Sequence, residues 1–195
     1  MRYPAQHKQE TRKRIVKAAA RQFRSRGSEG TAIGDLMRNL QLTHGGFYRH
    51  FKSKDDLFVE AFAEGHGGLH SKIMSAIERA PKGSEVEALI DTYLDIEHCD
   101  NPADGCPVAA LATELSRRPP QSRARLAFER ILKERTQRLA KYMPGDTDEE
   151  RARKVRMLMS GMAGTLTIAR VLTDESRRRR FLEDARKFYL EAVRR

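Results

Sequence analysis

The spacing of apolar residues constrains the fold of this chain more than any other feature. Apolar side chains recur every three to four positions almost from end to end, as in Ile33, Leu36, Met37 and Leu40. This period places them on one face of a helix, whereas a half-buried strand would alternate apolar and polar residues. No stretch of the sequence sustains such alternation. We therefore predict an all-α protein of about nine helices.

Glycine, proline and capping residues divide the apolar pattern into segments. The first helix spans about 6–26 and stops at Gly27, because glycine readily takes the left-handed conformation that ends helices. Thr31 then caps a short second helix, and Thr43 begins a third that ends near His50. We expect these three helices to pack as one small unit.

A longer fourth segment begins at Ser53. Gly65 and the pair Gly67-Gly68 within it each weaken a helix by about 1 kcal/mol relative to alanine, so a bend or a loosened turn is expected there. Five further helices follow, separated by loops that contain proline or glycine. The last two of them span about 147–172 and 174–194.

The positive charge of the chain is concentrated near its start. The net charge is +11, and residues 1–58 hold 13 of the 38 Lys and Arg but only 5 of the 27 Asp and Glu, a net charge of +8. A basic head on a nearly balanced body is typical of a protein that binds a polyanion. A solvated basic surface would give the same charge distribution.

The segment 32–51 has the layout of a helix-turn-helix. Two short helices joined by a tight link allow the second helix to lie in the major groove of DNA. Thr31 and Thr43 begin these helices, and each can present a hydroxyl and backbone N–H groups to a phosphate, which the helix dipole also favours. Gly45 and Gly46 cost about 1 kcal/mol each against alanine in a helix, which indicates close approach to DNA.

Polar side chains in and after the third helix offer the remaining DNA contacts. His44 can reach base edges, and Tyr48 and His50 can donate hydrogen bonds to phosphate oxygens. Arg49 suits a phosphate or a guanine, and Lys54 faces the DNA backbone from the first turn of the next helix.

Two aromatic residues of this segment have an alternative role. Phe47 and Tyr48 could belong either to the DNA-binding surface or to the core, whereas we assign Phe51 and Leu36 to the core alone.

Residues 9–62 contain two patterns in sequence: Ile15-Val16-x-Ala18-Ala19-x-x-x-Phe23, and Thr43-x-Gly45-x-Phe47-Tyr48-x-His50-Phe51-Lys52-Ser53-Lys54-x-x-Leu57. Together they resemble the N-terminal domain of the tetracycline-repressor (TetR) family of regulators. The resemblance implies an all-α homodimer that binds a palindromic site on double-stranded DNA through both heads. It also implies transcriptional repression that a small-molecule inducer relieves.

The sequence departs from the family pattern at two positions. Gln41 stands in the link where the family usually has a left-handed glycine, so this turn must strain a non-glycine residue or adopt another geometry. Met37 stands where a small alanine is common, which should shift the packing of the second helix on the third.

The resemblance divides the chain into a DNA-binding domain, 1–53, and a ligand-binding and dimerisation domain, 54–195. It implies a pocket between the fourth helix and those that follow, although most residues there could be plain core. The candidate pocket residues are His66, His70, Met74, Tyr93, Cys106, Phe128, Met159 and Met162.

The last two helices are the predicted dimer interface. Small residues over 161–165 permit close approach of another helix, and Phe181, Leu182 and Phe188 supply apolar area.

Cys106 is a candidate for reactivity. It precedes Pro107 at a predicted helix N-terminus, where the helix dipole stabilises a thiolate, and the segment Gly105-Cys106-Pro107-Val108 is similar to one in several family members, some of which sense electrophiles or oxidants. A small buried apolar residue is the alternative. Cys99 and Cys106 lack the spacing of a metal or redox pair.

Other classes of protein fit the sequence less well. No catalytic motif or phosphate-binding glycine loop is present, so we expect no enzyme activity. His66 and His70 lie four apart, but without a third ligand we expect neither a metal nor a cofactor. The remaining alternative is a helical interaction protein whose basic head binds an acidic partner other than DNA.

The sequence also predicts where the protein acts. No apolar run is long enough to cross a membrane, and the first residues lack the apolar core of a secretory signal. We therefore expect a cytoplasmic protein without a membrane partner.

Overall fold

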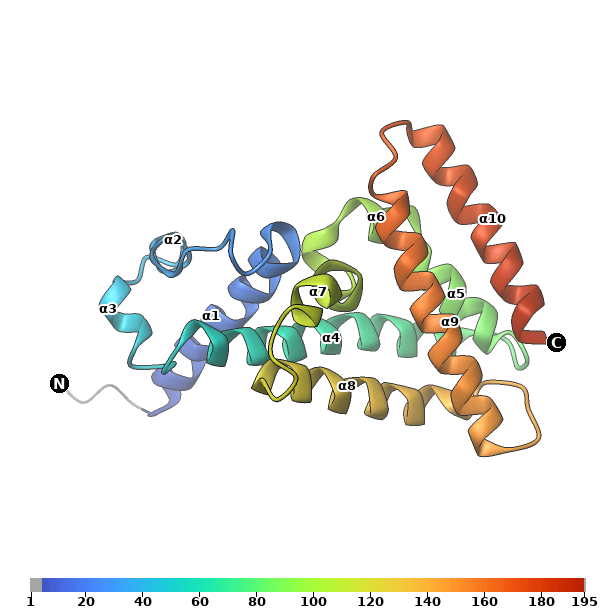
Figure 1. Ribbon diagram of the computed structural model, residues 1–195, viewed down its shortest axis with the longest axis horizontal. Helices are drawn as coiled ribbons and strands as arrows, with labels where there is room; N and C mark the ends of the chain where they lie inside the picture. The colour runs from blue at the N-terminus through green and yellow to red at the C-terminus, as the bar shows by residue number, and fades with distance from the viewer. Residues whose placement is uncertain (1–4, 195) are drawn as a thin grey trace.

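The computed structural model describes residues 5–194, and within that range the chain is entirely helical (Figure 1). This confirms the predicted fold class. The described part holds ten α-helices and one 3₁₀ helix, η1, because the predicted fifth helix is divided into two, α5 and α6. The elements are α1 (Ala5–Arg26), α2 (Ile33–Asn39), α3 (His44–Phe47), α4 (Lys54–Arg79), α5 (Glu85–Tyr93), α6 (Ile96–Asp100), η1 (Pro102–Asp104), α7 (Pro107–Ser116), α8 (Arg123–Ala140), α9 (Asp148–Ala169) and α10 (Glu175–Arg194).

The first three helices form one end of the molecule, to the left in Figure 1. Apolar faces of α1, α2 and α3 pack on the first turns of α4, where Leu57 and Phe58 are buried with Phe23 and Leu36. Residues of α7 and α8 complete this cluster, among them Leu111. The head and the body therefore share a continuous core across α4.

The start of α2 differs from the prediction. Ala32, not Thr31, is the N-cap residue, and no side chain caps the helix. Thr31 is only 2% exposed, and its hydroxyl donates a hydrogen bond of 2.9 Å to the carbonyl oxygen of Gly27. The threonine thus closes the turn after α1, because its hydroxyl finds an acceptor inside the fold.

The link between α2 and α3 holds Gln41 in a strained left-handed conformation, which is one of the two outcomes predicted for this turn. The N–H of Leu42 donates to Met37 and the N–H of Gln41 donates to Arg38, both at 2.9 Å, which is the Schellman arrangement that usually places glycine at the position of Gln41. Gln41 has φ of 59°, the only positive φ of a non-glycine residue in the described range.

The packing of α2 on α3 explains Met37. The Met37 side chain is buried, and its terminal methyl group lies 3.8 Å from where a β-carbon on Gly46 would be. The large residue on α2 therefore faces a residue without a side chain on α3.

Helix α4 runs through the middle of the molecule as one continuous, nearly straight helix, so the predicted bend at its glycines is wrong (Figure 1). Gly65 has a packing reason instead. A methyl group there would overlap the guanidinium of Arg24, which lies against α4 from α1. The glycine stays within a regular helix because tertiary contacts outweigh its low helix propensity.

The body consists of α5 to α10 around the second half of α4. A second cluster of buried apolar residues joins α4, α5, α9 and α10, with Ile73, Ile90, Leu158 and Leu182 among its members. In Figure 1, α8 lies along α4, and α9 and α10 stand side by side at the C-terminal end. No helix in the described range is both long and apolar enough to span a membrane.

The left-handed conformation at Gln41 predicts an effect on stability. Gln41→Gly removes a strain of about 1–2 kcal/mol and adds a glycine entropy cost of about 0.5–1 kcal/mol, so the free energy of unfolding should rise slightly. Gln41→Val should lower it, because a β-branched residue tolerates positive φ least. Urea denaturation followed by circular dichroism measures both, and a valine variant as stable as the glycine variant would contradict the strain.

Candidate nucleic-acid interface

Helix α3 is short and depends on its cap. Its N-cap residue, Thr43, accepts a hydrogen bond of 3.2 Å from the N–H of Gly46. The α-helix ends at Phe47 rather than near His50, and the chain continues in tight turns, with the N–H of His50 donating to Phe47. Two glycines in four residues favour this early end because glycine is a poor helix former.

The outer side of α3 is exposed and carries His44, the predicted base-reading residue, next to Tyr48, a predicted phosphate contact. The Tyr48 side chain is 63% exposed, and its ring meets the exposed His44 ring edge to face at 5.9 Å. A β-carbon on Gly45 would meet nothing within 4 Å. No contact inside the chain therefore requires Gly45 to lack a side chain.

Two of the predicted contact residues lie beneath this surface. Phe47 is 1% exposed and stacks on Phe51 at 5.4 Å, which settles its alternative role in favour of the core. Thr31 is buried with its hydroxyl occupied, as described above. Neither side chain is available to a polyanion, because core packing and an internal acceptor already use them.

Arg12 of α1 holds the turn after α3 in place. Its guanidinium donates hydrogen bonds to the carbonyl oxygen of His50 and to the carboxylate of Glu60 on α4, and it lies over the Phe51 ring at 4.2 Å. This one side chain therefore ties three elements together behind α3. The sequence analysis missed it because its partners are 38 to 48 residues away.

Basic groups surround His50. A hollow of about 590 Å³ lies between the start of α1 and α3, and its lining includes Lys8, Thr43, Arg49 and His50. Burial, followed by the charges of Lys8, Arg12 and Arg49, lowers the pKa of His50. The imidazole is therefore neutral near pH 7, and the surrounding cations leave the hollow positively charged.

Lys54 lies at the edge of the same end of the molecule. It is the first residue of α4 and is partly exposed, and Ser53 caps the helix by accepting a hydrogen bond of 3.0 Å from the N–H of Asp56. The cap fixes where α4 begins and so positions Lys54.

The predicted pocket residues do not form one site. His66 and His70 line a cleft between α4 and α8, while Phe128 packs on Phe62 at 5.7 Å in the N-terminal core. Tyr93, Cys106, Met159 and Met162 are buried in the core of the body, and Met74 packs against it.

Cys106 is the N-cap residue of α7 and is 1% exposed. Its burial favours the small apolar role that the sequence left open, because a reactive thiol needs access to its reagent.

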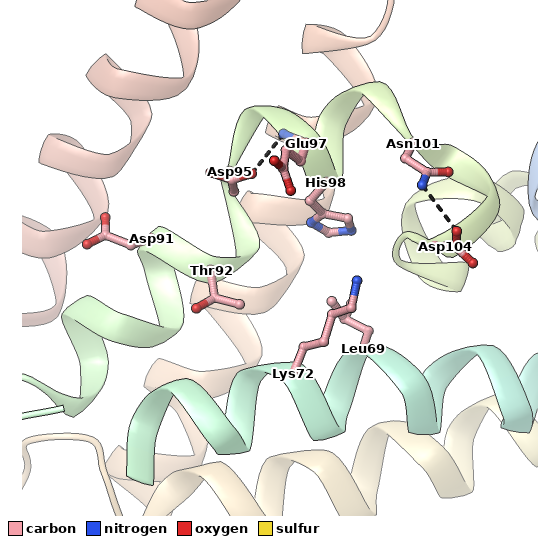
Figure 2. Close-up of a pocket in the computed structure, with 9 residues that line it drawn as sticks. All are labelled: Leu69, Lys72, Asp91, Thr92, Asp95, Glu97, His98, Asn101 and Asp104. Atoms are coloured by element: carbon pink, nitrogen blue, oxygen red, sulfur yellow. Dashed lines mark hydrogen bonds between the residues drawn. The ribbon is translucent and has the colours of Figure 1, made fainter. Parts of the chain in front are cut away.

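A second cleft, of about 460 Å³, lies between α4 and the segment from α5 to η1 (Figure 2). Its acidic side faces Lys72 across the opening. Its lining consists of Leu69, Lys72, Asp91, Thr92, Asp95, Glu97, His98, Asn101 and Asp104. None of these lining residues was among the predicted pocket residues, although His70 and Tyr93 are next to lining residues in sequence.

His98 holds the wall of this cleft together. Its Nε2 accepts a hydrogen bond of 2.9 Å from the N–H of Cys106, so Nδ1 carries the proton and donates to the carbonyl oxygen of Tyr93 at 2.5 Å. Burial lowers the pKa of His98 to about 4. A second proton would occupy the nitrogen that accepts from Cys106.

Comparisons with known proteins agree on one family. The family model for bacterial regulatory proteins of the tetR family matches residues 15–61. A helix-turn-helix transcriptional regulator from Mycobacterium tuberculosis H37Rv is 31% identical over 173 residues, which cover 84% of this chain and 86% of that protein. The regulator AcrR from Shigella flexneri is 42% identical over 55 residues, 28% of this chain and 26% of that protein.

A solved structure has the same fold over nearly the whole chain. The crystal structure of a TetR transcriptional regulator from Chloroflexus aurantiacus matches with a TM-score of 0.76 at 24% identity, covering 97% of each chain.

The environment of His98 predicts that acid destabilises the fold. The folded-state pKa of about 4 lies below the ordinary 6.5, so between these values the unfolded chain binds a proton that the folded protein does not. The contribution of His98 to the free energy of unfolding is therefore complete above pH 6.5 and is lost as the pH falls towards 4. In urea denaturation across that range, the free energy of unfolding should fall more steeply with decreasing pH for the wild type than for His98→Gln. The difference in slope should correspond to about one proton bound on unfolding. Equal slopes would contradict the assignment.

Proposed function

Since the chain belongs to the TetR family of bacterial regulatory proteins and is a DNA-binding transcriptional regulator, we propose that it is a repressor which a small-molecule inducer releases from a palindromic operator. We assign residues 1–53 to the DNA-binding head and 54–195 to a body for ligand binding and dimerisation. The protein acts in the cytoplasm, where bacterial DNA lies.

The observation that carries the DNA-binding assignment is the exposed side of α3. His44 and Tyr48 project from it, and Gly45 between them leaves open space for close approach of a DNA groove. We assign His44 to base edges and Tyr48 to a phosphate oxygen. The Tyr48 hydroxyl can donate that hydrogen bond, and a phosphate can accept it.

Phosphate contacts surround this central group. The Thr43 oxygen accepts the N–H of Gly46, and its hydroxyl proton is left to donate to a phosphate. Arg49, His50 and Lys54 supply the remaining contacts, and Lys8 extends the same basic hollow. We leave Thr31 and Phe47 out of the interface because both are buried.

Release by a ligand requires the body to act on the head. Several polar contacts join α1 and the loop after it to the body. Arg24 donates a hydrogen bond of 2.7 Å to the carbonyl oxygen of Ala103 in η1, Arg21 pairs with Asp104, and the N–H of Ser28 donates to Glu114 of α7 at 2.9 Å. A shift of η1 or α7 would therefore reorient α1, and with it the spacing of two heads on DNA.

TetR-family regulators dimerise, and we propose that this chain does so through α9 and α10. Five of the seven large apolar side chains exposed in the described range lie on these helices or directly after α9: Met157, Ile168, Val171, Phe181 and Phe188. The burial of such a surface supports a stable dimer.

The glycines of α9 have different roles in this interface. A β-carbon on Gly161 would lie 2.7 Å from the Tyr189 hydroxyl, so Tyr189 of α10 in the same chain already occupies the space beside Gly161. A β-carbon on Gly164 would meet nothing within 4 Å. Gly164 is therefore the position where a helix of a second copy can approach closely.

The division of roles on α3 and α4 predicts different effects on DNA binding. Lys54→Ala should weaken binding to the operator and to random DNA by a similar factor and reduce the salt slope by about one. His44→Ala should weaken operator binding alone, by about tenfold, because it reads a base edge. Fluorescence anisotropy at several salt concentrations measures both effects. Lys82→Ala, in the loop between α4 and α5, is the control and should change neither.

If Lys54→Ala and His44→Ala each weakened binding to the operator and to random DNA equally, this division of roles would be contradicted. Unchanged binding by both would contradict the proposed surface as a whole.

The dimer interface predicts a change of assembly state. Phe188→Glu places a charge among the apolar residues of α9 and α10, so light scattering should show a monomer where the wild type is a dimer, and operator affinity should fall with it. Leu126→Glu is the matched control because Leu126 is also exposed but lies on α8. A dimeric Phe188→Glu protein would place the interface elsewhere.

A further inference from the structure

Arg135 is a buried cation without a counter-ion in the described part of the chain. It lies on α8 with 7% of its surface exposed. Within residues 5–194 its guanidinium makes no hydrogen bond, its Nε is buried without an acceptor, and no carboxylate lies within 4 Å of it. A buried charge of this kind destabilises a fold strongly unless something pairs with it.

The neutral surroundings of Arg135 leave that charge uncompensated. The groups that act on it electrostatically are the Tyr93 hydroxyl and the Cys106 thiol, with no carboxylate among them. Burial lowers the pKa of Arg135, and burial raises that of Tyr93. An arginine nevertheless remains charged near pH 7, so the missing partner is an anion.

Arg135 opens into a cleft of about 260 Å³ between α4 and α8. Arg130 and Arg138 line the cleft beside it, and His66 and His70 line it from α4. The rest of the lining consists of the small or apolar residues Ala63, Gly67 and Ile131 and one acidic residue, Glu134. Three arginines against one acidic side chain make this cleft attractive to a negatively charged ligand.

The two histidines complete a set of hydrogen-bond donors. Their rings are stacked at 6.0 Å with an interplanar angle of 11°. Burial lowers the pKa of His66 to about 4, with Arg135, His70 and Arg138 as further causes. The imidazole is therefore neutral when the cleft holds no anion, and one of its nitrogens carries a proton to donate.

We propose that this cleft binds a small organic anion through its carboxylate or phosphate oxygens, with Arg135 as the counter-ion and His66 and Arg138 as further donors. A guanidinium pairs two N–H groups with such oxygens, which gives both strength and orientation. The inference rests on the proposed function, in which the body takes a ligand, and it names the chemical class of that ligand.

The position of the cleft connects it to the head. His66 directly follows Gly65, the residue on which Arg24 of α1 lies. An anion that draws α8 towards α4 at His66 therefore acts one residue from the contact that orients α1. Ligand binding and DNA binding are coupled through this part of α4.

Thermal denaturation and titration calorimetry of the full chain, without DNA, test the site. The probes are sodium hexanoate and sodium phosphate, each compared with sodium chloride at equal ionic strength, and hexanol is the uncharged analogue. Wild type should be stabilised by one or both oxyanions beyond chloride and not by hexanol. Stabilisation by hexanoate alone identifies a carboxylate, and stabilisation by phosphate alone identifies a phosphate.

Arg135→Met is the decisive variant. Without a probe it should be at least as stable as wild type, because the uncompensated charge is gone, and its affinity for the oxyanion should fall about tenfold or more. Lys133→Met removes a charge from the exposed side of the same helix and should keep the wild-type response. If Arg135→Met does not fold, Arg138→Gln at the rim should still weaken oxyanion binding.

Three results would overturn the site. They are no stabilisation beyond chloride, an equal response to hexanol, or an Arg135→Met protein that responds as wild type does.

Operator binding separates this inference from the proposed function. If the oxyanion releases DNA from wild type but not from Arg135→Met, the cleft is the inducer site. If the oxyanion binds at Arg135 and leaves DNA affinity unchanged, the site stands and its regulatory role is refuted. If the protein binds no DNA at low salt, the proposed function fails while the calorimetric result on the anion remains valid.

Discussion

The contact of Arg24 with α4 is the constraint on which the rest of the structure depends. The guanidinium leaves α1, lies where Gly65 has no side chain, and donates to the carbonyl oxygen of Ala103 in η1. Arg24 is only 9% exposed, so a small change at Gly65 or Ala103 has little solvent space to absorb it. Because α1 carries the DNA-binding head while α4 and η1 belong to the body, this packing sets the angle at which the head is presented.

The head needs such support because the region around α3 has little stability of its own. Helix α3 has four residues, two of them glycines, and the link before it holds Gln41 at a positive φ. Such features persist only where the surrounding structure holds them. Met37 beneath Gly46 and Arg12 behind His50 provide that support. The exposed surface that we propose for DNA binding is thus stabilised from behind.

The sequence predicted what local patterns determine. The helical period, the link at Gln41 and the exposed side of α3 follow from residues close together in the chain. Thr31 was assigned wrongly because its hydroxyl had two possible partners. It could accept from an N–H at a helix N-terminus or donate to the carbonyl of Gly27, and only the fold decides between them. The partners of Arg12, Arg24 and Arg135 lie far away in sequence or are missing, and no periodicity records such contacts. Gly65 predicted a bend by its propensity and has a packing role instead.

The account depends most directly on Arg24 lying against Gly65, and a double-mutant cycle measures that contact. In the wild-type background Gly65→Ala should lower the free energy of unfolding by about 1–3 kcal/mol, because the added methyl group displaces the guanidinium. In an Arg24→Ala background the same change should raise it by about 1 kcal/mol, as for an ordinary glycine in a helix. Such a reversal of sign, measured by urea denaturation, is the predicted result. Equal effects of Gly65→Ala in the two backgrounds would contradict the claim that this contact joins the head to the body.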